Sequence, residues 1–161
     1  MILKIKHGEV KIKLFSEIAP NHVERFKTLA ESKQYDGVVF HRVIEGFMAQ
    51  TGDVEFGNST NNKYDTRRVG TGGSNLPDLK AEFSNIAHER GILSMARSSD
   101  PNSANSQFFI CFDDSPHLDR NYTAFGKVIE GMEFIDMIKK GDGSSGSVKE
   151  PDKIISIRTT E

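Results

Sequence analysis

Short runs in which apolar and polar residues alternate recur along most of the chain. In residues 1–14 (MILKIKHGEVKIKL), apolar residues occupy every second position on both sides of a His7-Gly8 turn, and lysines fill most of the positions between them. This period of two is the pattern of a strand with one buried face. The segment is therefore predicted to form a β-hairpin, and the chain to fold mainly as β structure.

Further strand-like runs are rich in β-branched and aromatic residues and are separated by Gly, Asn, Asp and Ser. They are Val38–Ile44, Phe47–Thr51, Ile92–Ala96, Gln107–Phe112, Thr123–Ile129 and Ile154–Arg158. With the hairpin they give about eight strands. The polar segment Val54–Val69 and the connection Gly141–Pro151 are expected to be irregular.

Two segments have helical patterns. Pro20–Ser32 begins with a proline suited to a first helical position, and its apolar residues form one stripe. Glu133–Lys140 ends in lysines before Gly141. Both stripes are expected to face the core. We expect one domain over residues 1–161, a closed eight-stranded antiparallel barrel capped by the two α-helices, with an open sandwich as the alternative.

Composition restricts the class of protein. A hydrophobic fraction of 36%, 27% charged residues and a formal charge of −2 fit a soluble globular protein, and they give no reason to expect nucleic acid or a membrane as partner. The single cysteine, Cys111, lies in an apolar run and excludes an internal disulfide. Lysines interrupt every apolar stretch near the N-terminus, so a cytoplasmic location is the simplest expectation.

The densest group of reactive and apolar residues is FHRVIEGFMAQTGD, residues 40–53. Alternation predicts that Phe40 and Arg42 share one face of the first strand, and that Met48 and Gln50 share a face of the second, opposite Phe47. The pattern leaves open which face is the outer one. On local sequence alone, Arg42 fits a solvated or paired surface charge better than a functional group.

The same fourteen residues resemble the signature of the cyclophilins, and ILSMARSSDPNSANSQFFI, residues 92–110, resembles their second signature. Gly70-Thr71-Gly72-Gly73 resembles the family's glycine loop, and Leu118-Asp119 with the FGKV of residues 125–128 resembles the segment that closes its proline pocket. The resemblance runs from the first hairpin to the last strand. It implies a peptidyl-prolyl cis/trans isomerase that rotates X-Pro bonds, assists protein folding and needs no cofactor.

The resemblance also implies roles for single residues. Arg42 would be the catalytic cation, with Phe47 and Gln50 beside it as part of the catalytic group. The proline pocket would be formed by Phe47, Met48, Phe109 and Leu118, and Gln107 would position the substrate. The main chain at Ala96 and Arg97 would pair with the substrate, and Gly70, Thr71, His117 and Tyr122 would border the groove.

Three departures from the family pattern affect this interpretation. His117 replaces the tryptophan of cyclosporin-sensitive members, so binding of cyclosporin is expected to be weakened, unless His117 is merely a loop residue. Arg97 and Tyr122 are variants typical of bacterial members, and the Arg97 side chain is expected to modulate the surface rather than catalyse. The Val54–Val69 loop is longer than in compact members; it is either solvated decoration or a determinant of partner choice.

Other site types are not favoured. The GTGG run lacks the ending of a phosphate-binding loop, and the five histidines lack metal-ligand spacing, so no metal is expected. Asp119 with His117 lacks a serine at a nucleophile elbow. The remaining rival is a non-catalytic module that binds X-Pro peptides. We expect the protein to act as a monomer on proline-containing peptides and on unfolded or flexible protein segments.

Overall fold

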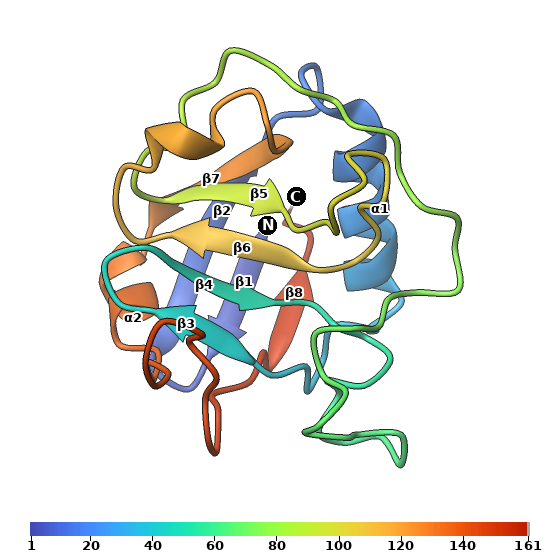
Figure 1. Ribbon diagram of the computed structural model, residues 1–161, viewed down its shortest axis with the longest axis vertical. Helices are drawn as coiled ribbons and strands as arrows, with labels where there is room; N and C mark the ends of the chain where they lie inside the picture. The colour runs from blue at the N-terminus through green and yellow to red at the C-terminus, as the bar shows by residue number, and fades with distance from the viewer. Residues whose placement is uncertain (161) are drawn as a thin grey trace.

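One curled antiparallel sheet dominates the computed structural model, which describes residues 1–160. The strands are β1 (Ile2–Ile5), β2 (Gly8–Leu14), β3 (Arg42–Ile44), β4 (Met48–Thr51), β5 (Ile92–Met95), β6 (Phe108–Cys111), β7 (Ala124–Glu130) and β8 (Ser156–Arg158). Their order in the sheet is β3-β4-β6-β5-β7-β2-β1-β8. In Figure 1, β3, β4, β6 and β5 cross in front of β1, β2 and β8, so the sheet folds over on itself as a half-barrel.

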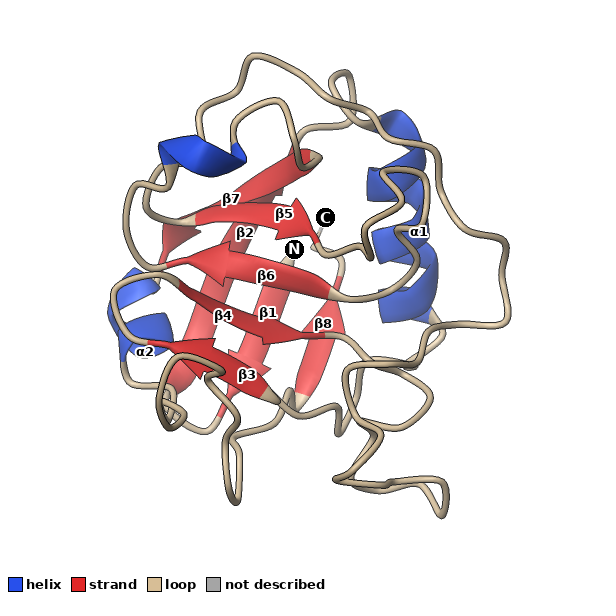
Figure 2. Ribbon diagram, in the orientation of Figure 1, coloured by secondary structure: helices blue, strands red, loops and turns tan. Residues whose placement is uncertain are grey.

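Helices α1 (Pro20–Glu31) and α2 (Met132–Asp136) flank the sheet on opposite sides, and a short 3-10 helix, η1 (Pro116–Leu118), lies above its front half (Figure 2). The apolar stripe predicted for α1 is confirmed to be core-facing, since Val23, Phe26, Leu29 and Ala30 are all buried. The second helix is shorter than predicted. No helix within residues 1–160 combines the length and the apolar character needed to cross a membrane.

The predicted N-terminal hairpin is confirmed. Leu3 of β1 lies opposite Val10 of β2, and Ile5 lies opposite Gly8. Both Leu3 and Val10 are fully buried, whereas Lys4 and Lys11 are exposed. The period of two therefore predicted the buried face of both strands correctly.

The predicted closed barrel is wrong. Within residues 1–160, the end strands β3 and β8 form no ladder with each other, and only isolated bonds join the segments ahead of them, such as Phe40 N to Asp152 O at 2.8 Å. The pairing continues as far as Phe40 and Asp152 and then ends, because Arg42 at the start of β3 is bridged to Ser147 of the Gly141–Pro151 connection instead. Of the predicted strand Val38–Ile44, only Arg42–Ile44 forms β3, and Val38 and Val39 form isolated bridges to Asn58 and Lys153.

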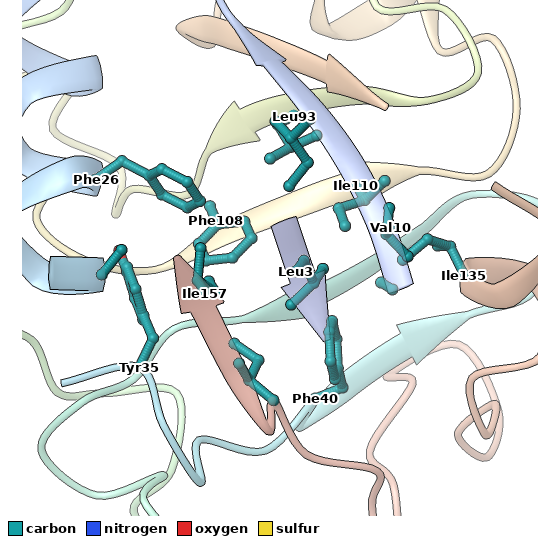
Figure 3. Packing of buried hydrophobic residues seen from close by; sticks show 14 of the residues in the cluster. Leu3, Val10, Phe26, Tyr35, Phe40, Leu93, Phe108, Ile110, Ile135 and Ile157 are labelled. Carbon is teal, nitrogen blue, oxygen red and sulfur yellow. The ribbon is translucent and has the colours of Figure 1, made fainter. Parts of the chain in front are cut away.

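The core fills the space between the two halves of the sheet, as Figure 3 shows. Phe26 of α1 packs against Phe108 and Phe125 with ring centroids 5.1 Å apart in both pairs, and against Tyr35 at 5.5 Å. The buried Tyr35 hydroxyl donates to Ser106 O at 2.8 Å, and burial raises the pKa of Tyr35. Each such aromatic side chain stabilises the fold by about 1.5–3 kcal/mol, so α1 is held firmly against the sheet.

The N-terminus of α1 is capped by a residue distant in sequence. Ala19 offers no capping side chain, but Glu82 accepts hydrogen bonds from the main-chain N–H of His22 at 2.9 Å and of Asn21 at 3.3 Å. The His22 ring Nδ1 lies 2.5 Å from the same carboxylate. Glu82 therefore supplies both the acceptor and the negative charge that a helix N-terminus favours.

Candidate active site

Antiparallel pairing places Arg42, Gln50 and Phe109 in one row across β3, β4 and β6. Arg42 lies opposite Gln50, and Gln50 lies opposite Phe109. The row on the other face of the same strands, Val43, Ala49 and Ile110, is fully buried in the core. The row of Arg42 therefore lies on the outer face, which answers the question that the sequence pattern left open.

Two of the side-chain orientations predicted from alternation are wrong. Phe40 lies in the main core rather than on the face of Arg42, because β3 begins only at Arg42. Phe47 packs with Met48 and Phe109 on the outer face, because it precedes β4 and follows Gly46, whose φ is +76°. The period of two holds only within the strand itself.

A pocket of about 130 Å³ opens on this outer face. Its lining residues are Arg42, Phe47, Met48, Gln50, Ala96, Arg97, Phe109, Leu118 and Tyr122. Met48, Phe109 and Leu118 are nearly completely buried and form an apolar floor. The volume corresponds to about four water molecules or one small ring. The structure thus brings nine of the candidate site residues together around one cavity.

The other four candidates lie next to the pocket rather than in its lining. His117 is exposed in η1 and packs its ring against Phe47, with centroids 5.4 Å apart and the ring planes tilted by 39°. Gly70, Thr71 and Gln107 line an adjoining depression of about 270 Å³, which shares Gln50, Ala96 and Arg97 with the pocket.

Hydrogen bonds join Arg42 to the glycine loop through two glutamines. Arg42 Nη1 donates to Gln50 Oε1 at 3.4 Å, and Gln50 Nε2 donates to Gln107 Oε1 at 3.0 Å. Gln107 Nε2 in turn donates to the carbonyls of Gly70 at 2.9 Å and Gly72 at 3.0 Å. The network fixes the polar side of the pocket before any ligand arrives.

Asp53 anchors the far end of this network, although the sequence analysis gave it no role. Its fully buried carboxylate accepts four backbone N–H bonds, from Glu55, Phe56, Gly70 and Gly72, at 2.7–3.0 Å. A Cβ on Gly72 would lie 2.5 Å from Asp53 Oδ1. Gly72 is therefore required because the carboxylate approaches its backbone so closely. In the sequence, the only sign of this anchor was that the segment of residues 40–53 ends in Asp53.

The connection Gly141–Pro151 also positions Arg42, which the sequence analysis missed. Ser145 O accepts a hydrogen bond from Arg42 Nε at 3.1 Å, and Gly146 O accepts one from Val43 N at 2.9 Å. Gly146 has a φ of +72°, and a Cβ there would lie 2.5 Å from Ile44. The loop thus packs closely against β3, and the carbonyl of Ser145 limits the movement of the Arg42 guanidinium.

The partly exposed Asp119 and the buried His88 and Ser94 form contacts that resemble those of a hydrolytic triad. His88 Nδ1 lies 3.1 Å from Asp119 Oδ1, and Nε2 lies 2.8 Å from Ser94 Oγ. Ser94 has 0% exposure and His88 only 1%, so no substrate reaches the hydroxyl. The arrangement instead ties β5 to the segment that carries Leu118, beside Phe109.

The rim opposite Arg42 is built from Arg97 and Tyr122. The Arg97 guanidinium lies 4.5 Å above the Tyr122 ring, and that ring meets Phe109 edge-on at 5.8 Å. A cation stacked on an aromatic ring is held in place by the ring's negative face. Arg97 and Tyr122 of the rim are therefore in continuous contact with Phe109 of the floor.

The free energy of unfolding is expected to fall when the pH is lowered from about 7 to about 5. Burial lowers the pKa of His41, next to Arg42, to about 4 despite the nearby Asp53 carboxylate, and it also lowers the pKa of His22 and His88. Below about pH 6.5 the unfolded chain binds protons that the folded chain does not, so stability is lost progressively toward about pH 4.

Urea unfolding at a series of pH values measures this dependence. His41→Asn is expected to reduce the slope, because one of the three groups is removed. The interpretation would be contradicted by a constant free energy of unfolding across this range, or by an unchanged slope in the variant.

Comparisons with known proteins agree with the geometry. A family model described as cyclophilin type peptidyl-prolyl cis-trans isomerase/CLD matches residues 1–159. A probable peptidyl-prolyl cis-trans isomerase of Brucella suis biovar 1 is 58% identical over 156 residues, covering 96% of this chain and 79% of that protein. Peptidyl-prolyl cis-trans isomerase-like 3 of Gallus gallus is 43% identical over 136 residues, 83% of this chain and 77% of the relative.

A solved structure gives the same result. It is a cyclophilin type peptidyl-prolyl cis-trans isomerase of Cryptosporidium parvum in the presence of the dipeptide Ala-Pro. It matches with a TM-score of 0.82 and 29% identity, covering 99% of this chain and all of the other. The family model spans nearly the whole chain, and sequence relatives and a solved structure agree with it. The chain therefore belongs to the cyclophilin family and is a peptidyl-prolyl cis/trans isomerase.

Proposed function

We propose that this isomerase holds a substrate proline in the apolar pocket and stabilises the twisted amide with Arg42. The ring would contact Phe47, Met48, Phe109 and Leu118. The observation that carries the proposal is that Arg42 lines the pocket while its Nε and Nη1 donate to Ser145 O and Gln50 Oε1. Among the described residues, its Nη2 has no hydrogen-bond partner and is available to a substrate.

Amide resonance explains why a fixed cation suits this reaction. It opposes rotation with a barrier of about 18–20 kcal/mol, and no covalent bond has to break. When the C–N bond twists, the proline nitrogen loses conjugation and its lone pair becomes a hydrogen-bond acceptor. A donor beside that nitrogen binds the twisted form more strongly than either planar form, which is the condition for catalysis. Arginine remains charged at every physiological pH.

The size of the effect requires more than Arg42 alone. Shortening exchange from tens of seconds to milliseconds takes about 5–6 kcal/mol. One charge-assisted hydrogen bond contributes about 1.5–3 kcal/mol. We assign the remainder to the preorganised glutamine network, to the low polarity of the floor, and to anchoring of the proline ring while the acyl side rotates.

The substrate main chain would pair with the edge at Ala96 and Arg97. Ala96 N is already bound to Gln107 O at 3.0 Å. Among the described residues, Ala96 O and Arg97 N have no such partner, which leaves one acceptor and one donor for an extended peptide. Recognition through main-chain groups supports broad substrates, namely proline-containing peptides and unfolded or flexible protein segments, and a role in protein folding.

We further propose a single-domain monomer that acts in the cytoplasm without nucleic acid or membrane. One sheet and one main core extend over the described residues. The exposed large apolar side chains come from separate segments, and the lone Cys111 is buried. A formal charge of −2 gives no support for nucleic acid or an anionic membrane as a partner.

Exchange spectroscopy of a short Ala-Pro peptide tests the mechanism. The wild-type protein is expected to produce cis–trans exchange at a rate that is constant from about pH 6.5 to about pH 9, because no acid or base takes part. A bell-shaped dependence on pH would indicate proton transfer and would contradict the proposal.

Cyclosporin inhibition is expected to be weak because His117 packs on Phe47 with a ring smaller than indole. His117→Trp is expected to strengthen inhibition at least about tenfold by supplying a larger contact surface and an N–H donor. The inhibition constants of both proteins should be measured with the same peptide. Nanomolar inhibition of the wild type would contradict the expectation.

A further inference from the structure

The lining of the pocket contains two cations and no anion. Arg42 and Arg97 both line the pocket, and its lining includes no Asp or Glu. Within residues 1–160, neither guanidinium has a carboxylate oxygen within 4.0 Å. By contrast, Arg90 and Arg158 are each paired with an aspartate at 2.6–2.7 Å. Positive charge is therefore left uncompensated at the place where substrate binds.

Arg97 is held in a fixed position. Its Nε and Nη2 donate to Asn121 O at 3.1 and 2.7 Å, and its Nη1 donates to Ser98 O at 2.9 Å. These bonds use three of the five N–H groups of a guanidinium, so two stay available. Its partners are neutral carbonyls and the Tyr122 ring, which position the charge without cancelling it. A preorganised cation loses little side-chain entropy when it pairs with a ligand.

The position of Arg97 determines which part of a substrate can reach it. Arg97 lines both the pocket and the adjoining depression beside the glycine loop. A peptide with its proline in the pocket and its neighbouring residues in the depression must pass this side chain. An extended chain advances about 3.3 Å per residue, so the substrate residue near Arg97 lies within two positions of the proline.

We propose that Arg97 is a specificity-determining residue and that the enzyme prefers substrates with Asp or Glu within two residues of the proline. This inference rests on the proposed function, because it requires the proline to occupy the pocket. An acidic side chain would meet the free N–H groups of Arg97, whereas a lysine at the same position would be repelled by its charge.

The test compares peptide pairs that differ only in Glu or Lys, placed in turn at each of the two positions before and after the proline. The measured quantity is the ratio of kcat/KM for the Glu peptide to that for the Lys peptide. At low salt we expect a ratio of about three to ten at one position or more. The ratio should approach one at about 0.5 M salt, where exposed charges are screened.

Two substitutions locate the source of the preference. Arg97→Gln should bring the ratio close to one, and a general change in activity cancels because both peptides are measured with the same variant. Arg120→Gln is the matched control, since it removes a positive charge from an exposed residue beside Asn121 that lines neither cavity. It should retain the wild-type ratio. If Arg97→Gln fails to fold, Arg97→Lys should give an intermediate ratio.

Equal rates for Glu and Lys peptides at all four positions would overturn the inference, as would a ratio that persists in Arg97→Gln. Failure of the proposed function looks different. In that case Arg42→Ala would leave the rate with every peptide at the wild-type value, whatever the Glu-to-Lys ratio.

Discussion

Replacing Arg42 by alanine is expected to lower kcat/KM for X-Pro isomerisation at least tenfold, while the protein remains folded. The loss corresponds to one charge-assisted hydrogen bond of about 1.5–3 kcal/mol to the twisted amide nitrogen. The Arg42 side chain is exposed, and the core face of β3 is formed by Val43, which pairs with Ala49 of β4. Folding therefore does not depend on the Arg42 side chain. Exchange spectroscopy on an Ala-Pro peptide, with circular dichroism as a check on folding, measures both quantities.

Arg67→Ala is the matched control for the Arg42 variant. Arg67 has a 93% exposed side chain and lines a neighbouring cavity but not the pocket, so its removal changes the net charge by the same amount while the pocket lining stays intact. It should leave kcat/KM within about twofold of the wild type, since exposed charges at a distance are screened. Equal losses in the two variants would show that only overall charge matters.

Replacing Asp53 by asparagine is expected to lower the free energy of unfolding by about 2–4 kcal/mol. The carboxylate accepts four backbone hydrogen bonds while fully buried. An amide of the same size presents an NH₂ donor to one pair of those N–H donors, so two buried donors lose their acceptor. The glycine loop should then move, and with it the carbonyls that hold Gln107, so kcat/KM should fall as well.

Asp65→Asn, in the adjoining Val54–Val69 loop, is a control for this substitution. Asp65 lies on the partly exposed surface, and its side chain accepts a backbone hydrogen bond from Arg67 N at 2.9 Å. Its loss should cost less than about 1 kcal/mol. Urea unfolding of both variants provides the comparison. An Asp53→Asn protein as stable as the wild type would show that the carboxylate is not the anchor of the loop.

Much of the fold was predictable because it depends on local periodicity. The alternation around Leu3 and Val10 identified the first hairpin and its buried face, and the stripe on Pro20–Ser32 identified the core face of α1. Closure of the sheet was not predictable. It depends on how far Val38–Phe40 pairs with Asp152–Ile154 before Arg42 turns to Ser147, and these segments are far apart in sequence.

The lining of the site was predictable only through the cyclophilin resemblance. Periodicity left Arg42 as an ordinary surface charge and assigned Phe47 to the wrong face. The structure brings Arg42 and Phe47 to one pocket because β4 pairs with β3 on one side and with β6 on the other. The tertiary supports were missed altogether. Asp53, Ser145 and Glu82 act through backbone groups of distant segments, and no spacing rule in one sequence identifies such pairs.

The central claim is that Arg42 binds the twisted amide more strongly than the planar one. The direct measurement separates kcat from the peptide dissociation constant for the wild type and Arg42→Ala, using one Ala-Pro peptide, exchange spectroscopy and titration. We predict that kcat falls at least tenfold while the dissociation constant changes less than about threefold. An unchanged kcat with the whole loss in peptide binding would contradict the mechanism.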